Sequence, residues 1–264
     1  MSMQTTIISV DIRTHPQLGE DYTGTIFRGW LGASLHCTKH GDCVRNCPDK
    51  TSCPYNMVFK EKNDIKPYSL LSFRAGDLIR GFIKVHGDKQ EFVPEIVSRI
   101  NDHSNAVHFK GHHYSVEEIS VRKLDPSPPE WGDRVRIQSL SPLYLEKNER
   151  MEILPELAHI LSASIRAYNR VCKFYARDSY PYRTEIDLKN LHAPILDYDI
   201  KTVQIAHKSM DGRMISLKGI CGNILYDTST VSPEAGKILH LGSHLQIGKH
   251  STYGFGGFIV KCEV

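Results

Sequence analysis

The chain has 264 residues, of which 40% are hydrophobic and 24% charged, so it can hold two ordinary domains with a sizeable core. Residues 1–10 lack the basic start and apolar stretch of a secretory signal, and no apolar run approaches the roughly 18 residues of a membrane helix. We therefore expect a cytoplasmic protein without a membrane partner. The formal net charge of +3 is compatible with a nucleic-acid partner but does not require one.

The first half of the chain reads as β-α-β-β-α-β, the order of a ferredoxin-like unit. Residues 6–13 alternate like a half-buried strand, and residues 23–36 place apolar side chains at helical spacing. Small residues and then His36 form a second stripe on this helix, which predicts either tight packing or close approach of a ligand. The other expected elements are strands at 55–62 and 77–86, a helix at 91–103 and a strand at 114–124.

The second half repeats the pattern after the proline-rich linker 126–129, which divides the chain into domains 1–130 and 131–264. Its expected elements are strands at 134–145, 201–208 and 214–227, helices at 154–177 and 233–246, and a last strand to residue 262. The sequence thus predicts two tandem α+β, ferredoxin-like domains. Four basic residues recur along the long helix, either as a solvated face or as phosphate contacts: Arg166, Arg170, Lys173 and Arg177.

A glycine-rich loop, residues 247–256, lies between the last predicted helix and the last strand. Glycine permits positive φ and close approach of a ligand to the backbone. Consecutive amide groups in such a turn can form an anion site, to which Lys249 and His250 add charge or hydrogen-bond donors. The loop therefore predicts contact with a phosphate-bearing partner; the plainer alternative is a helix-to-strand turn with glycine at the helix C-cap.

Four of the seven cysteines are clustered in a polar segment: Cys37, Cys43, Cys47 and Cys53. In a cytosolic protein, clustered thiols favour zinc over disulfides, and a bound metal orders a loop that has no core of its own. The spacing lacks a C-x₂-C pair, so unligated cysteines stay an alternative, with His36 and His40 as substitute ligands. The sequence thus predicts a structural zinc site in a cysteine-rich loop of the first domain.

Three features resemble the RAMP superfamily of CRISPR systems, and within it the endoribonuclease that cuts precursor CRISPR RNA. They are the glycine loop, the segment 135–144 with the long basic helix after it, and the segment 28–36 that leads into the cysteines. The resemblance implies binding of CRISPR repeat RNA, with other Cas effector subunits as further partners and no small-molecule substrate. It places RNA contacts on the basic helix and on Gly248, Lys249, His250, Ser251, Thr252, Tyr253, Gly254 and Gly256.

The same resemblance implies cleavage without a metal cofactor, in which a ribose 2′-OH attacks the phosphorus and leaves a 2′,3′-cyclic phosphate and a 5′-OH. This chemistry needs a base, an acid and cationic groups, and histidine suits the first two roles. His36 stands where the family often places its catalytic histidine, at the end of the first helix, and His40 is the alternate. Tyr22 is expected to orient or donate, and Arg28 and Lys60 to stabilise charge. A cysteine follows His36 directly, so a structural role for His36 stays open.

Two other functions remain alternatives. One is a non-catalytic RAMP subunit that binds crRNA inside an effector complex, and the other is a metal-stapled ferredoxin-like binding protein unrelated to CRISPR. A histidine near the first helix and compact domains without long insertions favour the nuclease. A cleavage assay on repeat RNA in EDTA separates the enzyme from the non-catalytic subunit.

Overall fold

The computed structural model describes residues 3–15, 22–36, 49–60, 65–104, 107–109, 111–124, 127–128, 130–208 and 212–263. Four residues predicted to take part in sites lie outside these ranges: Cys37, His40, Cys43 and Cys47. Contacts divide the chain into two units, residues 1–124 with 174–176, and residues 125–173 with 177–264. Within the described residues, no helix has the length and apolar character needed to cross a membrane.

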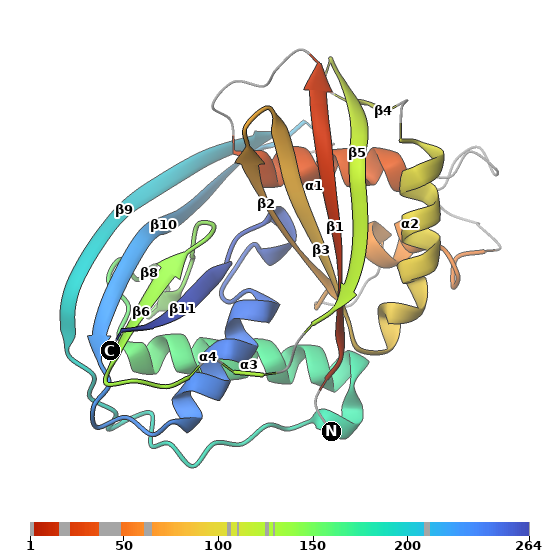
Figure 1. The fold of residues 1–264 in the computed structure, drawn as a ribbon. Coiled ribbons are helices and arrows are strands. Elements are labelled where there is room, and N and C mark those ends of the chain that lie inside the picture. Colours follow the sequence, from red (N-terminus) through yellow and green to blue (C-terminus); the bar gives the residue numbers. More distant parts are fainter. Residues whose placement is uncertain are drawn as a thin grey trace. The chain divides into compact units, whose positions relative to one another are not determined.

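The first unit is an antiparallel sheet with the strand order β2-β3-β1-β5-β4 (Figure 1). Its elements are β1 (Thr5–His15), α1 (Thr23–Leu35), η1 (Asn56–Lys60), β2 (Tyr68–Ala75), β3 (Leu78–His86), η2 (Gly87–Phe92), α2 (Val93–Asp102), β4 (Val107–Phe109) and β5 (His112–Lys123). Apart from the short edge strand β4, the sheet has four main strands. The first and third of these, β1 and β3, are central, and the second and fourth, β2 and β5, flank them. This is the ferredoxin-like arrangement predicted from the sequence.

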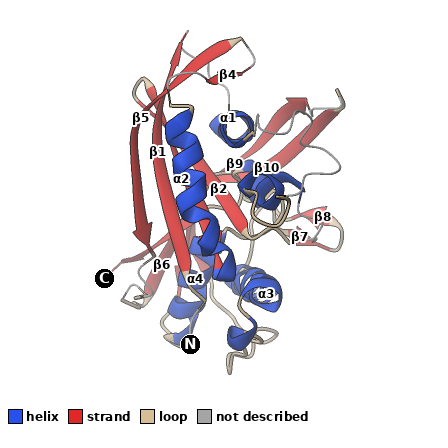
Figure 2. Cartoon of the chain, turned by 90° about the vertical axis from the view of Figure 1, so that its right-hand side faces the viewer, coloured by secondary structure: helices blue, strands red, loops and turns tan. Residues whose placement is uncertain are grey.

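Both helices of the first unit contribute side chains to one core with the sheet, and Figure 2 shows α2 lying along the strands. Alternate residues of β1 point into this core, which is why Ile8 and Val10 are fully buried. The rings of Phe27 and Trp30 on α1 stack at 5.5 Å. A Cβ atom at Gly81 of β3 would lie 2.1 Å from the Phe27 ring, so glycine is required for this helix to pack on the sheet.

The prediction of a strand at residues 55–62 is wrong. Residues 56–60 form a single π-helical turn, η1, and the second strand is β2. Met57 and Val58 are both buried, and two adjacent side chains can share a core in a helical turn but point to opposite faces of a strand. The ring of Phe59 lies 3.3 Å from the position of a Cβ atom on Gly32. The small stripe of α1 therefore serves tight packing at this position.

The second unit repeats the arrangement, with the sheet order β11-β6-β10-β9 (Figure 1). Its elements are β6 (Arg134–Ser139), β7 (Glu146–Lys147), β8 (Arg150–Met151), α3 (Leu157–Tyr175), η3 (Arg177–Ser179), β9 (Ile195–Lys208), β10 (Met214–Asp227), α4 (Glu234–Leu245), η4 (Ser251–Tyr253) and β11 (Phe258–Glu263). The first and third of its four main strands, β6 and β10, are again central, and β9 and β11 flank them. The predicted fold class of two tandem ferredoxin-like domains is confirmed.

The strand expected at 134–145 stops earlier than predicted. It ends at Ser139, because the amides of Leu140 and Ser141 both turn to the carbonyl oxygen of Gly257, at 2.8 and 3.2 Å. The hydroxyl of Ser141 in turn accepts the Gly257 amide at 2.9 Å. The chain after β6 is thus bound to the segment that follows the glycine loop, and this contact positions the loop described below.

Candidate functional sites

His36 lies where α1 ends. Its backbone has left the helical conformation, and its amide donates to the Ala33 carbonyl oxygen at 3.3 Å. The side chain is exposed, and its ring meets the ring of Tyr55 edge-on, with centroids 5.7 Å apart. An imidazole in this position is accessible to a ligand while its ring also contacts the protein through Tyr55.

A row of aromatic rings connects His36 to Arg28 on the same helix. The Tyr55 ring contacts the Phe59 ring at 5.2 Å, and the Arg28 guanidinium lies over the Phe59 ring at 5.0 Å from its centroid. Arg28 also donates to the hydroxyl of Tyr68 at 2.7 Å. The structure therefore connects two of the predicted catalytic residues, His36 and Arg28, through the rings of Tyr55 and Phe59. Phe59 belongs to η1 and Tyr55 directly precedes it, and the sequence assigned both to a strand.

The other two described catalytic candidates lie at different places. Lys60 is the last residue of η1; it directly follows Phe59 in the chain and is exposed. Tyr22 is the N-cap of α1, at the opposite end of the helix from His36 and about 20 Å away along its axis. The structure does not bring Tyr22 to His36.

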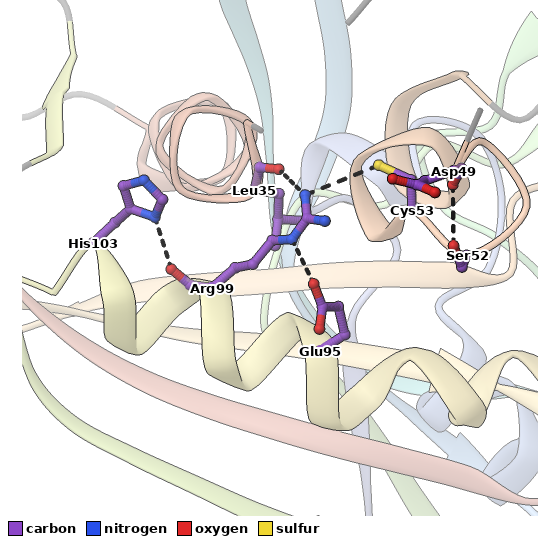
Figure 3. A network of polar contacts seen from close by, with 7 residues as sticks. All are labelled: Leu35, Asp49, Ser52, Cys53, Glu95, Arg99 and His103. Atoms are coloured by element: carbon purple, nitrogen blue, oxygen red, sulfur yellow. Dashed lines mark hydrogen bonds and ion pairs between the residues drawn. The ribbon is translucent and has the colours of Figure 1, made fainter. Parts of the chain in front are cut away.

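Arg99 on α2 supports the end of α1 (Figure 3). One guanidinium nitrogen donates to the carbonyl oxygen of Leu35 at 2.9 Å and lies 3.9 Å from the sulfur of Cys53. Another donates to Glu95 at 2.9 Å. The last carbonyl groups of a helix lack partners within it, so a cation here satisfies the helix end and holds the residue before His36. Sequence reasoning missed Arg99, since only its local pairing with Glu95 is visible without the fold.

The glycine-rich loop needs its glycines, as predicted. Gly248, Gly254 and Gly256 have φ of 81°, 90° and 85°, a region that side chains with a Cβ atom rarely adopt. A Cβ atom on Gly248 would lie 2.1 Å from the Tyr144 carbonyl oxygen, and one on Gly256 would lie 2.2 Å from the Ile247 carbonyl oxygen. The loop is therefore packed backbone to backbone against the segment after β6.

Five backbone amides of the loop are already hydrogen-bonded and are therefore not part of a row of free amides. They donate to carbonyl oxygens of the protein at 2.8–3.2 Å and belong to Lys249, Tyr253, Gly254, Phe255 and Gly256. The hydrogen bonds close the loop on itself and onto the chain before β7. An anion site at this loop would consequently depend on side chains more than on a backbone nest.

The charge of Lys249 is paired. Its ammonium group forms a hydrogen-bonded ion pair with Glu146 and lies 5.4 Å from the centroid of the Tyr144 ring. The hydrogen bond to Glu146 raises the pKa of Lys249, so the side chain is cationic at neutral pH. The carboxylate of Glu146 offsets the charge of Lys249. A phosphate that binds Lys249 would therefore either share the ammonium group with this carboxylate or displace it.

His250 is a neutral member of the loop. It adopts left-handed backbone with φ of 68°, and its ring lies between Tyr144 at 5.8 Å and Phe255 at 5.7 Å. Burial lowers the pKa of His250, and the charge of Lys249 lowers it further. At neutral pH the imidazole therefore offers a hydrogen bond or an aromatic face rather than a positive charge. Tyr253 similarly meets His207 of β9, with ring centroids 5.2 Å apart.

The basic stripe of α3 is solvent-facing. Arg166, Arg170 and Lys173 are all exposed, while Leu161, Tyr168 and other apolar residues of the helix are buried in the core. Arg166 donates to the hydroxyl of Ser162 at 2.7 Å. Phosphate contacts require this exposure, and a purely solvated face has it as well. Exposure therefore agrees with both interpretations of the stripe.

The predicted zinc site lies mostly outside the described residues. Only Cys53 of the four cysteines is described, and it is buried beside Arg99. Among the residues that the structure describes, no group of three or more histidine, cysteine or acidic side chains could hold a metal ion. Zinc binding by Cys37, Cys43, Cys47 and Cys53 stays a prediction.

The chain thus consists of two ferredoxin-like units, the second with a glycine-rich loop before its last strand. Residues 137–258 match the family model of the CRISPR-associated endoribonuclease Cas6. The matched region runs from β6 to β11 and contains the basic stripe and the glycine loop. The resemblance to the CRISPR RNA-processing endoribonucleases predicted from the sequence is confirmed.

Solved structures of Cas6 share the fold along the whole chain. Thermus thermophilus Cas6 (TTHB231) superposes with a TM-score of 0.65 at 13% identity, covering 99% of this chain and 100% of that one. Its product complex gives 0.63 at 12% identity, over 98% and 99% of the two chains. A product complex of Cas6 (TTHA0078) gives 0.60 at 12% identity, again over 98% and 99%. No curated protein sequence matches the chain.

Proposed function

We propose that this protein is an endoribonuclease that binds CRISPR repeat RNA and cleaves it to give mature crRNA. The observation that carries the proposal is an exposed histidine at the end of α1 in a chain whose second unit matches the Cas6 family. Two of the structurally similar Cas6 proteins are product complexes, which is consistent with an RNA-cleaving role. Part of one chain in a partial Cas6-RT-Cas1–Cas2 complex, 47% of its length, also has this fold, so other Cas proteins are proposed as partners.

In the proposed mechanism the reaction needs no metal ion. A base removes the proton of the 2′-OH, the 2′-oxygen bonds to phosphorus, and the bond from phosphorus to the 5′-oxygen breaks as that oxygen takes a proton from an acid. His36 serves as base or acid, because imidazole exchanges protons near neutral pH. Arg28 and Lys60 would stabilise the extra charge on the phosphorus-bound oxygens. The products are a 2′,3′-cyclic phosphate and a 5′-OH.

We further propose that binding and chemistry are divided between the units. The glycine loop and the α3 stripe belong to the second unit, whereas His36 belongs to the first. Replacing Lys249 and Arg170 together by alanine should weaken binding of repeat RNA and lower the salt slope, by about one unit or less for each residue. Cleavage at saturating protein should stay near the wild-type rate. A binding titration at two salt concentrations, with single-turnover kinetics, checks both expectations.

Glu146→Gln is the matched variant for this test. It removes the carboxylate that pairs with Lys249 and leaves the side-chain size unchanged. RNA affinity should therefore rise, and it should fall in Lys249→Ala. If neither substitution changes affinity or its salt dependence, Lys249 does not contact phosphate.

Arg99 is expected to position the catalytic histidine. Arg99→Ala removes the contact to the Leu35 carbonyl oxygen and should slow single-turnover cleavage on the order of 10- to 100-fold, because small misplacements of reacting groups are costly. The dissociation constant for repeat RNA should stay unchanged. Glu95→Gln, which keeps the contact to Leu35, should cleave at close to the wild-type rate. Loss of affinity in parallel with rate would assign Arg99 a general structural role instead.

The zinc site is proposed as structural, separate from the cleavage step. Purified protein should then carry about one equivalent of zinc by elemental analysis. Replacing Cys43 and Cys47 together by serine should lose that metal and leave the fold of the second unit intact. Metal-free wild-type protein of unchanged stability would exclude a structural zinc.

Incubation of the purified protein with repeat RNA tests the proposed function against its main alternative. A nuclease cuts the RNA at one position within or beside the repeat. A non-catalytic RAMP subunit binds the same RNA and leaves it intact at saturating protein. Binding without cleavage would favour the second function.

A further inference from the structure

Two histidines face each other on α4, outside the sites described above. The Nε2 atoms of His240 and His244 are 3.1 Å apart, and their ring centroids are 4.2 Å apart with planes at 88°. Both side chains are half-buried. Residues four apart on a helix are neighbours on one face, so a regular backbone holds this pair together.

The distance suits a shared metal ion. A zinc-like ion binds imidazole nitrogen at about 2.0–2.1 Å, which places two ligand nitrogens about 2.9 Å apart at a right angle and about 3.3 Å apart at the tetrahedral angle. The observed 3.1 Å lies between these values. An ion at this position would replace the hydrogen bond between the two imidazoles and keep the distance between their nitrogens nearly unchanged. Two histidines at this helical spacing are also the ligand pair of the H-E-x-x-H metal motif.

We propose that His240 and His244 form a bidentate site for a divalent transition ion, of which Ni²⁺, Cu²⁺ and Zn²⁺ are the best matches. Imidazole is a ligand for these ions, whereas Mg²⁺ and Ca²⁺ select oxygen. No third histidine, cysteine or acidic side chain joins the pair within the described part of the chain, so the proposed site has two protein ligands and leaves its other positions to water. Such a site is open and exchangeable, unlike a closed four-ligand structural site.

The ion would link the last two turns of α4. His244 lies in the final turn, directly before Leu245, where the helix ends and the glycine loop begins. An ion that binds only the folded helix stabilises it by mass action. This role is independent of the proposed cleavage by His36, because it concerns a different unit and a different measurement.

Full-length protein treated with EDTA and then desalted provides the test. Ni²⁺ is titrated by calorimetry and thermal unfolding is followed with and without Ni²⁺, in the wild type and in His240→Ala. A second variant combines Leu241→His with His244→Leu, which keeps the number of histidines but places them at adjacent positions that do not face each other. His192→Ala, an exposed histidine elsewhere in the second unit, is the control. Unfolding in EDTA verifies that each variant is folded.

The wild type and His192→Ala should bind one Ni²⁺ at this site and unfold at a higher temperature with it. Both α4 variants should bind about 10²-fold more weakly or not at all, because one of two linked ligands is lost. Co²⁺ bound here should lack the charge-transfer absorption of a thiolate ligand, which separates this site from the cysteine cluster. Equal Ni²⁺ affinity in the wild type and the relocated-histidine variant would overturn the proposal, as would cobalt binding that shows only thiolate ligation.

Discussion

His36→Ala should cleave repeat RNA about 10²- to 10⁴-fold more slowly than the wild type, because a general acid or base typically contributes this much to the rate. The affinity for RNA should change little, since the proposed phosphate contacts lie on the second unit. His36 is exposed, its ring makes a T-shaped contact with Tyr55, and its backbone amide donates to Ala33. Its removal should therefore change the free energy of unfolding by no more than about 0.5 kcal/mol.

Single-turnover cleavage at saturating protein, with a binding titration on the same preparations, measures both effects. His112→Ala, at the start of β5 in the same unit, is the control and should keep the wild-type rate. A wild-type rate in His36→Ala would make His36 structural. His40 and Arg28 would then be tested in its place.

Gly256→Ala should destabilise the second unit by more than about 2 kcal/mol, because left-handed backbone alone costs a residue with a Cβ atom about 1–2 kcal/mol. The added Cβ atom would lie 2.2 Å from the carbonyl oxygen of Ile247, and backbone cannot rotate away as a side chain can. The loop would have to leave its hydrogen bonds to Pro142 and Ile247. Affinity for repeat RNA should fall with it if the loop contacts RNA.

Gly212→Ala separates the cost of left-handed backbone from the cost of the close approach to a carbonyl oxygen. Gly212 has φ of 82°, close to the 85° of Gly256, but a Cβ atom there has no atom of the described residues within 4 Å beyond its chain neighbours. It should therefore show only the conformational cost of about 1–2 kcal/mol. Denaturant unfolding of both variants measures the difference. Equal destabilisation would mean that the loop relaxes around the new methyl group and that the close approach is not required.

Hydrophobic periodicity predicted most of the fold. The apolar positions of α1, including Phe27, Trp30 and Leu31, are buried as the helical spacing indicated. The failure at residues 55–62 has a local cause: Met57 and Val58 are adjacent apolar residues, and only the packing against α1 decides that both face one core. Likewise, β6 ends at Ser139 because of hydrogen bonds to Gly257, a partner that lies more than a hundred residues away.

In the candidate sites, too, the sequence predicted local features and missed contacts between distant segments. Positive φ at Gly248, Gly254 and Gly256 follows from the residue type, so the sequence predicted it. The pairing of Lys249 with Glu146 and the contact of Arg99 with Leu35 join segments far apart in the chain. Neither leaves a local pattern, which is why only the folded structure reveals that the loop cation has a partner and that the end of α1 has a support.

Cleavage of repeat RNA by the wild-type protein in excess EDTA, with analysis of the product ends, tests the central claim most directly. We expect cleavage at the same rate as in Mg²⁺, with a 2′,3′-cyclic phosphate on the upstream fragment and a 5′-OH on the downstream fragment. Activity that disappears in EDTA and returns with Mg²⁺, or products with a 5′-phosphate, would contradict attack by the 2′-OH with His36 as the proton-transfer group.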